Sequence, residues 1–288
     1  MDARSWTCSA VLGLAVACAS STASSIGPST LERIKSAKVI KLGYRDSAVP
    51  FSYLGSDGNP VGYSVDLCTR IVDGLRKELA LPDLRADWVK VTPDTRIDAL
   101  VDGAIDLECG STTVTLSRQK RVDFSNLIFV DGASLLGRAD SGFGTLGALA
   151  GKRVAVVSGT TTEHVLHDAL KKAGVSVQVV AVKYSREAFL AVDQQRVEAF
   201  AADRAILVNL ALTSPHPDRY AIIDAWLSYE PYGLVLRRDP DFRLAVNRQL
   251  ARIYRSGSIL ELYRTWFGKL GRTGNLLAAI YELYALPE

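Results

Sequence analysis

Five segments near the start of the chain decide its fold: residues 39–43 (VIKLG), 64–80 (SVDLCTRIVDGLRKELA), 88–91 (WVKV), 95–101 (TRIDALV) and 105–109 (IDLEC). The first, third and fifth are short apolar runs of the kind that form strands. The second places its apolar residues on one helical face, and the fourth is predicted to be a shorter helix. Strands that alternate with helices in this way predict a mostly parallel sheet with helices on its faces.

The same pattern recurs in the second half of the chain. Residues 154–157 (VAVV) are a predicted strand that leads through residues 158–161 (SGTT) into a helix, and a later strand, 199–202, ends at Asp203. Four apolar positions of the first unit recur at one constant offset: Leu31, Ile34, Val39 and Leu42 correspond to Leu146, Leu149, Val154 and Val157. A second α/β unit therefore begins near residue 140.

Two extended segments, residues 128–136 and 229–235, are predicted to connect the two units. Helices predicted after the second connection return the chain to the first unit. We therefore expect lobe one to comprise residues 28–133 and 234–288, and lobe two to comprise residues 134–233. The predicted fold is α/β, with a mostly parallel sheet and flanking helices in each lobe and two hinge strands between them. Ligands bind such folds at the carboxyl ends of the strands, which here face a cleft between the lobes.

The first residues of the chain differ in kind from the rest. Residues 10–19 (AVLGLAVACA) are an apolar run that follows Arg4 and precedes the small residues SSTASS. This layout predicts a secretory signal peptide over residues 1–25 and a periplasmic product. The run is too short to span a bilayer, which takes about 20 residues. Two alternatives remain: an apolar tail without a targeting role, and lipid attachment at Cys18.

The four cysteines divide between the predicted signal and the mature chain. Cys8 and Cys18 lie in the signal, and Cys68 and Cys109 remain after it. Two cysteines can pair in an oxidising compartment, but spacing alone does not show that their positions allow it. Two buried thiols are the favoured interpretation.

Composition and motifs exclude several classes of protein. The 288 residues carry a formal net charge of +3 without a block of Lys or Arg, so the sequence does not indicate nucleic-acid binding. The sequence contains neither a G-x-S-x-G elbow nor a phosphate-binding GxxxxGK[ST] loop. His164 and His167 lack a strong third ligand for a metal. We therefore expect no catalytic residue, no metal and no cofactor.

A binding site for a free amino acid has definite chemical requirements. The α-carboxylate requires a guanidinium and helix N-terminal N–H groups, and the ammonium requires a carboxylate with hydroxyls or carbonyls. Each group is present beside a predicted strand end, and the candidates are Arg45, Arg96, Ser111, Thr113, Arg118, Thr160, Thr161 and Asp203. Arg45 and Arg96 supply further cations that an acidic side chain would require.

Each candidate also has a structural interpretation. Thr160 with Glu163 forms a capping box, so Thr160 could serve only to begin a helix. Arg118 lies in a charged run typical of a solvated face. Arg45, Arg96 and Asp203 could be surface residues in ion pairs.

Several motifs together resemble the family 3 periplasmic solute-binding proteins, in particular the glutamate/aspartate-binding members. The motifs are residues 49–53 (VPFSY), 62–66 (GYSVD), 106–113 (DLECGSTT), 118–119 (RQ) and 158–161 (SGTT). The resemblance covers essentially the whole chain after the predicted signal. It implies the periplasmic-binding-protein fold, whose two lobes close over a ligand and dock on the membrane permease of an ABC-type importer.

The resemblance also implies a role for each candidate residue. It makes Arg118 the clamp on the α-carboxylate, helped by Thr113, Thr160 and Thr161. Ser111, Thr113 and Asp203 look like the ammonium site. Arg45 and Arg96 look like the pair that receives a side-chain carboxylate, which implies glutamate or aspartate as the ligand.

Two departures from the family pattern bear on this assignment. The acidic-ligand members carry Ser where this chain has Pro93, and His where it has Ser185 beside Tyr184. The lost His puts the affinity, or the choice between glutamate and aspartate, in doubt. A dehydratase-like enzyme and a soluble sensor on the same scaffold remain as alternatives to a transport receptor.

Overall fold

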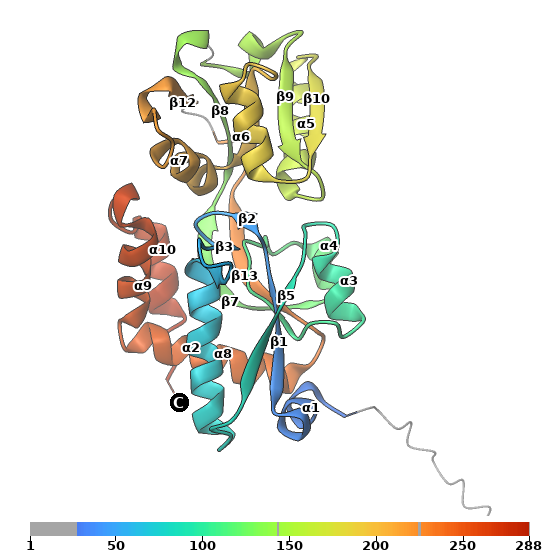
Figure 1. Ribbon diagram of the computed structural model, residues 1–288, viewed down its shortest axis with the longest axis vertical. Helices are drawn as coiled ribbons and strands as arrows, with labels where there is room; N and C mark the ends of the chain where they lie inside the picture. Colours follow the sequence, from blue (N-terminus) through green and yellow to red (C-terminus); the bar gives the residue numbers. More distant parts are fainter. Residues whose placement is uncertain (1–27, 143, 224–225, 288) are drawn as a thin grey trace, which may run out of the picture.

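The computed structural model describes residues 28–142, 144–223 and 226–287, which form the two lobes seen one above the other in Figure 1. The sheet of lobe one has the order β5 (Arg85–Lys90), β1 (Val39–Tyr44), β6 (Leu107–Glu108), β13 (Glu230–Leu236) and β7 (Asp123–Asp131). The sheet of lobe two has the order β10 (Gln178–Val182), β9 (Arg153–Val157), β11 (Ala199–Asp203), β8 (Ala133–Arg138) and β12 (Tyr220–Ile222). The predicted two-lobed α/β fold is confirmed.

Each sheet is parallel on one side and antiparallel on the other. In lobe one β5, β1 and β6 run parallel, whereas β13 is antiparallel to both β6 and β7. In lobe two β10, β9 and β11 run parallel, whereas β8 is antiparallel to β11 and β12. The expectation of a mostly parallel sheet therefore holds for β5, β1 and β6 in lobe one and for β10, β9 and β11 in lobe two, whereas the strands beside the crossing between the lobes are antiparallel.

Helices flank both sheets, as the amphipathic patterns predict. In lobe one they are α1 (Thr30–Ala37), α2 (Tyr63–Glu78), α3 (Arg96–Val101), α4 (Leu116–Gln119), α8 (Pro240–Arg255), α9 (Ser258–Phe267) and α10 (Asn275–Leu283). In lobe two they are α5 (Thr161–Ala173), α6 (Ser185–Asp193) and α7 (Arg204–Leu212). A small sheet of β2 (Ser47–Ala48), β3 (Ser52–Leu54) and β4 (Pro60–Val61) projects from lobe one toward lobe two (Figure 1). Short 3₁₀ turns span Ala139–Ser141, Leu146–Leu149, Pro217–Arg219 and Gly268–Leu270.

The crossing segments pass each other at close range. The chain leaves lobe one along β7 and enters β8 after Gly132, and it returns along residues 226–229 into β13. A Cβ atom at Gly132 would overlap the Ser228 carbonyl oxygen and the Trp226 ring. Only glycine therefore fits where the two crossing segments meet. Beneath them an aromatic cluster supports β13, because Phe51 packs 5.3 Å from Tyr232 and 5.0 Å from Phe129, measured between ring centroids.

Cys68 on α2 and Cys109 after β6 form a disulfide bond. Their Cα atoms lie 6.2 Å apart, within the range that a disulfide spans. The preference for two buried thiols is therefore wrong. The reason is that α2 packs on the lobe-one sheet with Cys68 directed at the end of β6. Sequence spacing does not specify how a helix is rotated about its own axis against a sheet.

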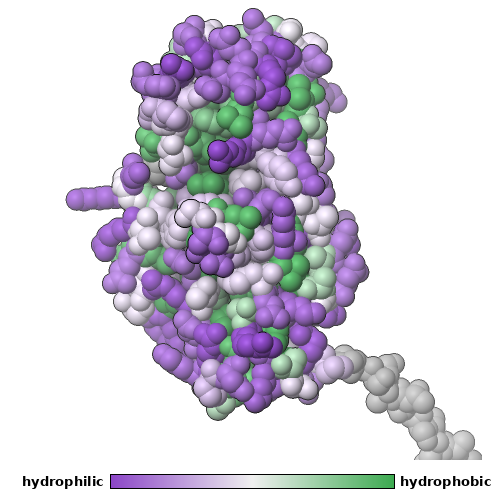
Figure 2. All heavy atoms as spheres, viewed as in Figure 1, coloured by the Kyte–Doolittle hydropathy of each residue, from purple (hydrophilic) through white to green (hydrophobic). Residues whose placement is uncertain are grey.

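Polar side chains cover most of the face seen in Figure 2, and apolar side chains appear in small separate groups, some at the waist between the lobes. Across the described ranges, no helix is both long and apolar enough to pass through a membrane. The predicted signal peptide and Cys18 lie outside the described residues.

Candidate functional site

A small cavity of about 30 Å³ lies between the lobes. Seven of the eight predicted site residues line it: Arg45, Arg96, Ser111, Thr113, Thr160, Thr161 and Asp203. Ligand pockets typically enclose about 300–1,000 Å³. The cavity is therefore much smaller than a typical ligand pocket.

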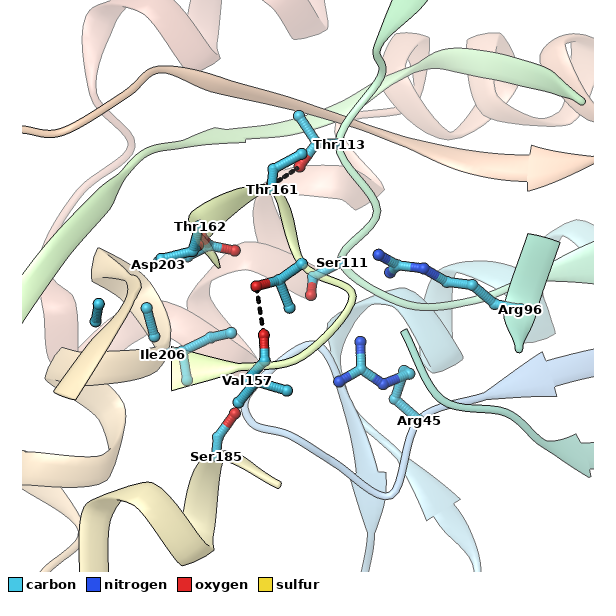
Figure 3. Close-up of a pocket in the computed structure, with 13 residues that line it drawn as sticks. Arg45, Arg96, Ser111, Thr113, Val157, Thr161, Thr162, Ser185, Asp203 and Ile206 are labelled. Atoms are coloured by element: carbon cyan, nitrogen blue, oxygen red, sulfur yellow. Dashed lines mark hydrogen bonds between the residues drawn. The ribbon is translucent and has the colours of Figure 1, made fainter. Parts of the chain in front are cut away.

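The strand ends bring these residues together. Arg45 follows β1, Ser111 and Thr113 follow β6, and Thr160 and Thr161 follow β9. Asp203 is the last residue of β11, and Arg96 begins α3. Figure 3 shows Arg45 and Arg96 extending from lobe one toward Ser111, with Asp203 and Thr162 on the opposite side of the cavity.

Arg96 is held by partners within lobe one. Its side chain is almost fully buried, as is that of Glu108, and an Nη1–Oε1 distance of 4.0 Å separates the two. Arg96 Nη1 also donates a hydrogen bond to Thr112 Oγ1, which in turn donates to Glu108 Oε2 at 2.8 Å. The carboxylate of Glu108 therefore offsets the charge of Arg96 from inside the protein.

Arg45 is in a different situation. It is 5% exposed, and among the described residues its guanidinium has no hydrogen-bond or ion-pair partner. Burial, followed by the neighbouring Arg96, lowers the pKa of Arg45 from 12.5 to about 10, so the guanidinium stays protonated at neutral pH. Glu108, Asp46 and Asp203 offset part of its charge from a distance. A buried guanidinium at the cavity wall without a hydrogen-bonded partner still favours an anionic group on the ligand.

Asp203 is the carboxylate on the lobe-two side of the cavity. Its Oδ1 accepts a hydrogen bond of 3.0 Å from Thr162 Oγ1, and its Oδ2 accepts one from the hydroxyl of Tyr232 on β13. Burial and the charge of Glu230 raise the pKa of Asp203 to about 6. A carboxylate fixed in this way, with an anionic neighbour, suits a bound cation such as an ammonium group.

Thr113 and Thr161 meet across the cleft. Thr113 belongs to lobe one and Thr161 begins α5 of lobe two, and their hydroxyl oxygens lie 3.1 Å apart. Both hydroxyls donate to Oε2 of Glu230, which is 1% exposed at the start of β13, and the bond from Thr161 measures 2.5 Å. One carboxylate thus contacts both lobes.

Thr160 is the N-cap of α5, as its structural interpretation requires, but the predicted capping box is incomplete because Glu163 Oε2 accepts the N–H of Gly159 rather than that of Thr160. Its hydroxyl accepts the Glu163 backbone N–H and donates to the Val157 carbonyl oxygen at 2.7 Å (dashed in Figure 3). The preceding Gly159 has φ +71°, and a Cβ there would overlap the carboxylate of Asp94 in lobe one. Thr160 both caps α5 and forms part of the cavity wall, so the two interpretations are compatible.

Arg118 is the predicted residue that does not line the cavity. It lies half-buried on α4, and its Nη1 donates to the Thr113 carbonyl oxygen at 2.9 Å. Burial and the charge of Arg96 lower the pKa of Arg118 to about 10. Its position next to Thr113 keeps the guanidinium at the edge of the site.

Sequence reasoning did not select several residues of the site. The further lining residues are Val157, Thr162, Ser185, Ala201, Ala202 and Ile206. Ser185 lies at the position where the resemblance places a His in acidic-ligand relatives. Glu108, Glu230 and Tyr232 lie behind the wall and hold its side chains. A carboxylate within a predicted strand could have pointed to Glu108, whereas Glu230 is the first residue of β13 and the sequence carries no comparable signal for it.

Within the described part of the chain, no group of three or more His, Cys, Asp or Glu side chains is arranged to hold a metal ion. The polar groups at the cavity are instead cations, hydroxyls and one lining carboxylate.

The chain is similar in sequence to known proteins. The sequence pattern of the bacterial extracellular solute-binding proteins, family 3, matches residues 40–269. The chain is 38% identical over 242 residues to the L-glutamate/L-aspartate-binding protein of Pseudomonas aeruginosa, covering 83% of this chain and 80% of that protein. It is 34% identical over 262 residues to the glutamate/aspartate import solute-binding protein of Escherichia coli, covering 90% of this chain and 87% of that protein.

A similar solved structure is that of an ancestral amino acid-binding protein described as a precursor of cyclohexadienyl dehydratase. It superimposes with a TM-score of 0.72 at 26% identity, covering 83% of this chain and all of that one.

Proposed function

The chain belongs to family 3 of the bacterial extracellular solute-binding proteins, and from this we propose that it binds glutamate or aspartate for import. In this proposal the bound amino acid is delivered to the membrane permease of an ABC importer. The relatives named for glutamate and aspartate support the choice of ligand class.

The observation that carries the proposal is the distribution of charge around the cavity. Arg45 presents a buried cation without a protein partner on one side, and Asp203 presents a fixed carboxylate on the other. An amino acid with an acidic side chain offers the complementary pair, a side-chain carboxylate and an α-ammonium. A basic amino acid would instead add a positive charge beside Arg45 and Arg96, which costs free energy in a site of low dielectric.

Within the site, we assign Arg45 and Arg96 to the side-chain carboxylate. Ser111, Thr113 and Asp203 are assigned to the ammonium. The α-carboxylate is assigned to Arg118 and to the N-terminus of α5, where Thr160 and Thr161 lie and free N–H groups favour an anion. Arg118 uses one N–H on Thr113, which leaves other donors of the guanidinium for the ligand.

The proposed lobes comprise residues 28–133 with 234–288, and residues 134–233. These bounds fall within the crossing strands, because β8 begins at Ala133 and β13 spans Glu230–Leu236. Separation of these lobes would admit the ligand, and closure would bury it. We further propose that the protein acts outside the cytoplasm after removal of residues 1–25, as a monomer that does not bind nucleic acid.

We also propose that the protein performs no chemistry on its ligand. Among the described residues, Asp203 is the one carboxylate that lines the cavity, and it is assigned to the ammonium. An eliminating enzyme requires a further acid or base beside the reacting carbon. Nuclear magnetic resonance of glutamate incubated with the protein tests this point, and the spectrum should stay unchanged.

The binding proposal is tested by calorimetry against a panel of amino acids. The expected order is glutamate or aspartate, then glutamine or asparagine, then lysine and arginine. Arg118→Ala should weaken binding of all of them by about two to three and a half decades, because it leaves a buried carboxylate unpaired. Equal affinity for glutamate and glutamine would refute the acidic ligand, and a loss below tenfold in Arg118→Ala would refute the clamp.

A further inference from the structure

Glu230 is a buried carboxylate that the assigned site does not use. It lies at the start of β13, where the returning chain enters lobe one, and it accepts hydrogen bonds from three hydroxyl groups. Thr113 and Thr161 donate to Oε2, and Ser228 donates to Oε1 at 2.8 Å. Glu230 does not line the cavity, so apart from its charge, which acts on Asp203, its influence on a ligand passes through the two threonines that do.

These hydrogen bonds determine whether each threonine hydroxyl can donate or accept a hydrogen bond at the cavity. A threonine hydroxyl has one hydrogen to donate and lone pairs that accept. When Thr113 and Thr161 both give their hydrogen to Glu230, they can present only lone pairs to the cavity. Such hydroxyls accept hydrogen bonds from an ammonium group and have no hydrogen left for a carboxylate.

The same arrangement operates elsewhere in this protein. Thr112 donates its hydroxyl hydrogen to Glu108 and accepts a hydrogen bond from the guanidinium of Arg96. There a buried carboxylate orients a threonine hydroxyl so that its lone pairs face a cation. Glu230 bears the same relation to Thr113 and Thr161, and the cation that completes the arrangement would be the ligand's ammonium.

We propose that Glu230 is a positioning residue for the ammonium group of the ligand, which acts by orienting the hydroxyls of Thr113 and Thr161 as acceptors. The inference rests on the proposed function. It moves the hydroxyl of Thr161 from the α-carboxylate to the ammonium side, and it leaves the α-carboxylate to Arg118 and to backbone N–H groups. Thr113 and Thr161 belong to different lobes. The carboxylate of Glu230 can therefore orient both hydroxyls only when the lobes are closed.

The test is a set of variants titrated with L-glutamate and with glutarate, the same diacid without the α-amino group. Glu230→Gln keeps the shape of the side chain but places an amide that donates where only acceptors stood. We expect glutamate affinity to fall about tenfold or more, as for loss of a hydrogen bond to a charged group, and glutarate affinity to change less than about threefold.

A second series removes the hydroxyls themselves. Thr113→Val with Thr161→Val should weaken glutamate binding, and adding Glu230→Gln to this pair should cause little further loss. This result follows because Glu230 then has no cavity hydroxyl to orient. Asp106→Asn is the matched control, since Asp106 is a buried carboxylate bonded to Arg33 and to the Lys41 backbone N–H rather than to the cavity residues. It should leave both affinities unchanged.

The outcomes separate the inference from the proposed function. A wild-type protein that binds no amino acid would overturn the proposed function. If the wild type binds glutamate, equal losses for glutamate and glutarate in Glu230→Gln would overturn the role of Glu230 alone. The role of Glu230 would also be overturned if Glu230→Gln lowered the glutamate affinity of the Thr113→Val, Thr161→Val variant by the same factor as it lowers that of the wild type. Should Glu230→Gln fail to fold, Thr161→Val carries the test, because it must weaken glutamate more than glutarate.

Discussion

Two buried arginines at one side of the cavity have different surroundings, and this difference predicts different phenotypes. The guanidinium of Arg45 has no hydrogen-bond or ion-pair partner among the described residues, whereas that of Arg96 is paired with Glu108 and Thr112. Arg45→Ala should therefore lower glutamate affinity about tenfold to a hundredfold, and bring the affinities for glutamate and glutamine together. Calorimetry with both ligands measures this ratio. Arg45→Lys is the control, because it keeps the charge and should retain part of the preference.

Arg96→Ala should lower the free energy of unfolding of the protein, even without ligand. It removes one partner of a buried pair and leaves the charge of Glu108 uncompensated, which typically costs about 3–5 kcal/mol. Urea denaturation without ligand would measure the loss. A variant as stable as the wild type would show that Glu108 does not depend on Arg96.

The carboxyl of Asp203 predicts a pH dependence of binding. Its pKa is raised from 3.8 to about 6 by burial and by Glu230, so the folded protein holds this proton more strongly than the unfolded chain does. Protonation of Asp203 therefore favours the folded state as the pH falls through 6. The same protonation removes the negative charge that a bound ammonium group requires. Glutamate affinity should fall about tenfold between pH 7 and pH 5. Glutarate has no ammonium and should lose less affinity, through protonation of its own second carboxylate only, and a flat profile for glutamate would contradict the assignment.

The sequence identified seven of the cavity residues because their positions follow from a general rule. Arg45, Ser111, Thr161 and Asp203 come at the carboxyl ends of strands that strand–helix alternation reveals, and parallel strands bring those ends to one edge. Glu230 could not be found in this way. It lies 117 residues from Thr113, and the two meet because β13 returns antiparallel beside β6, a strand order that periodicity does not encode.

At the scale of elements, the disulfide joins α2 to the end of β6, two elements that sequence reasoning predicted but could not orient toward each other. The bond closes a loop of 41 residues, for which restriction of the unfolded chain gives about 4 kcal/mol of stabilisation. Reduction should lower the free energy of unfolding by up to this amount. Denaturant titration with and without reductant measures the change.

The double variant Cys68→Ala with Cys109→Ala is the control for this measurement. It should be as unstable as the reduced wild type and insensitive to reductant. If reductant shifted the midpoint of the double variant equally, the effect on the wild type would not come from this bond.

At the scale of the whole molecule, the lobes lie close together, with a cavity of about 30 Å³ and direct contacts across the cleft. Besides the pair Thr113 and Thr161, the ammonium of Lys90 in lobe one lies 5.6 Å from the ring centroid of Tyr184 in lobe two. A ligand that touches both lobes favours the closed state. Small-angle scattering should therefore show a smaller radius of gyration with saturating glutamate. A curve unchanged at saturation would argue against closure on binding.

The strand order of lobe one also fixes when that lobe can be completed during synthesis. β13 lies between β6 and β7, yet residues 230–236 leave the ribosome long after both neighbours. All five strands of lobe two, by contrast, lie in the continuous stretch 133–222. A nascent chain can therefore assemble its second lobe while the first still has a gap in its sheet. The sheet of lobe one is therefore completed only after residues 230–236 have been made.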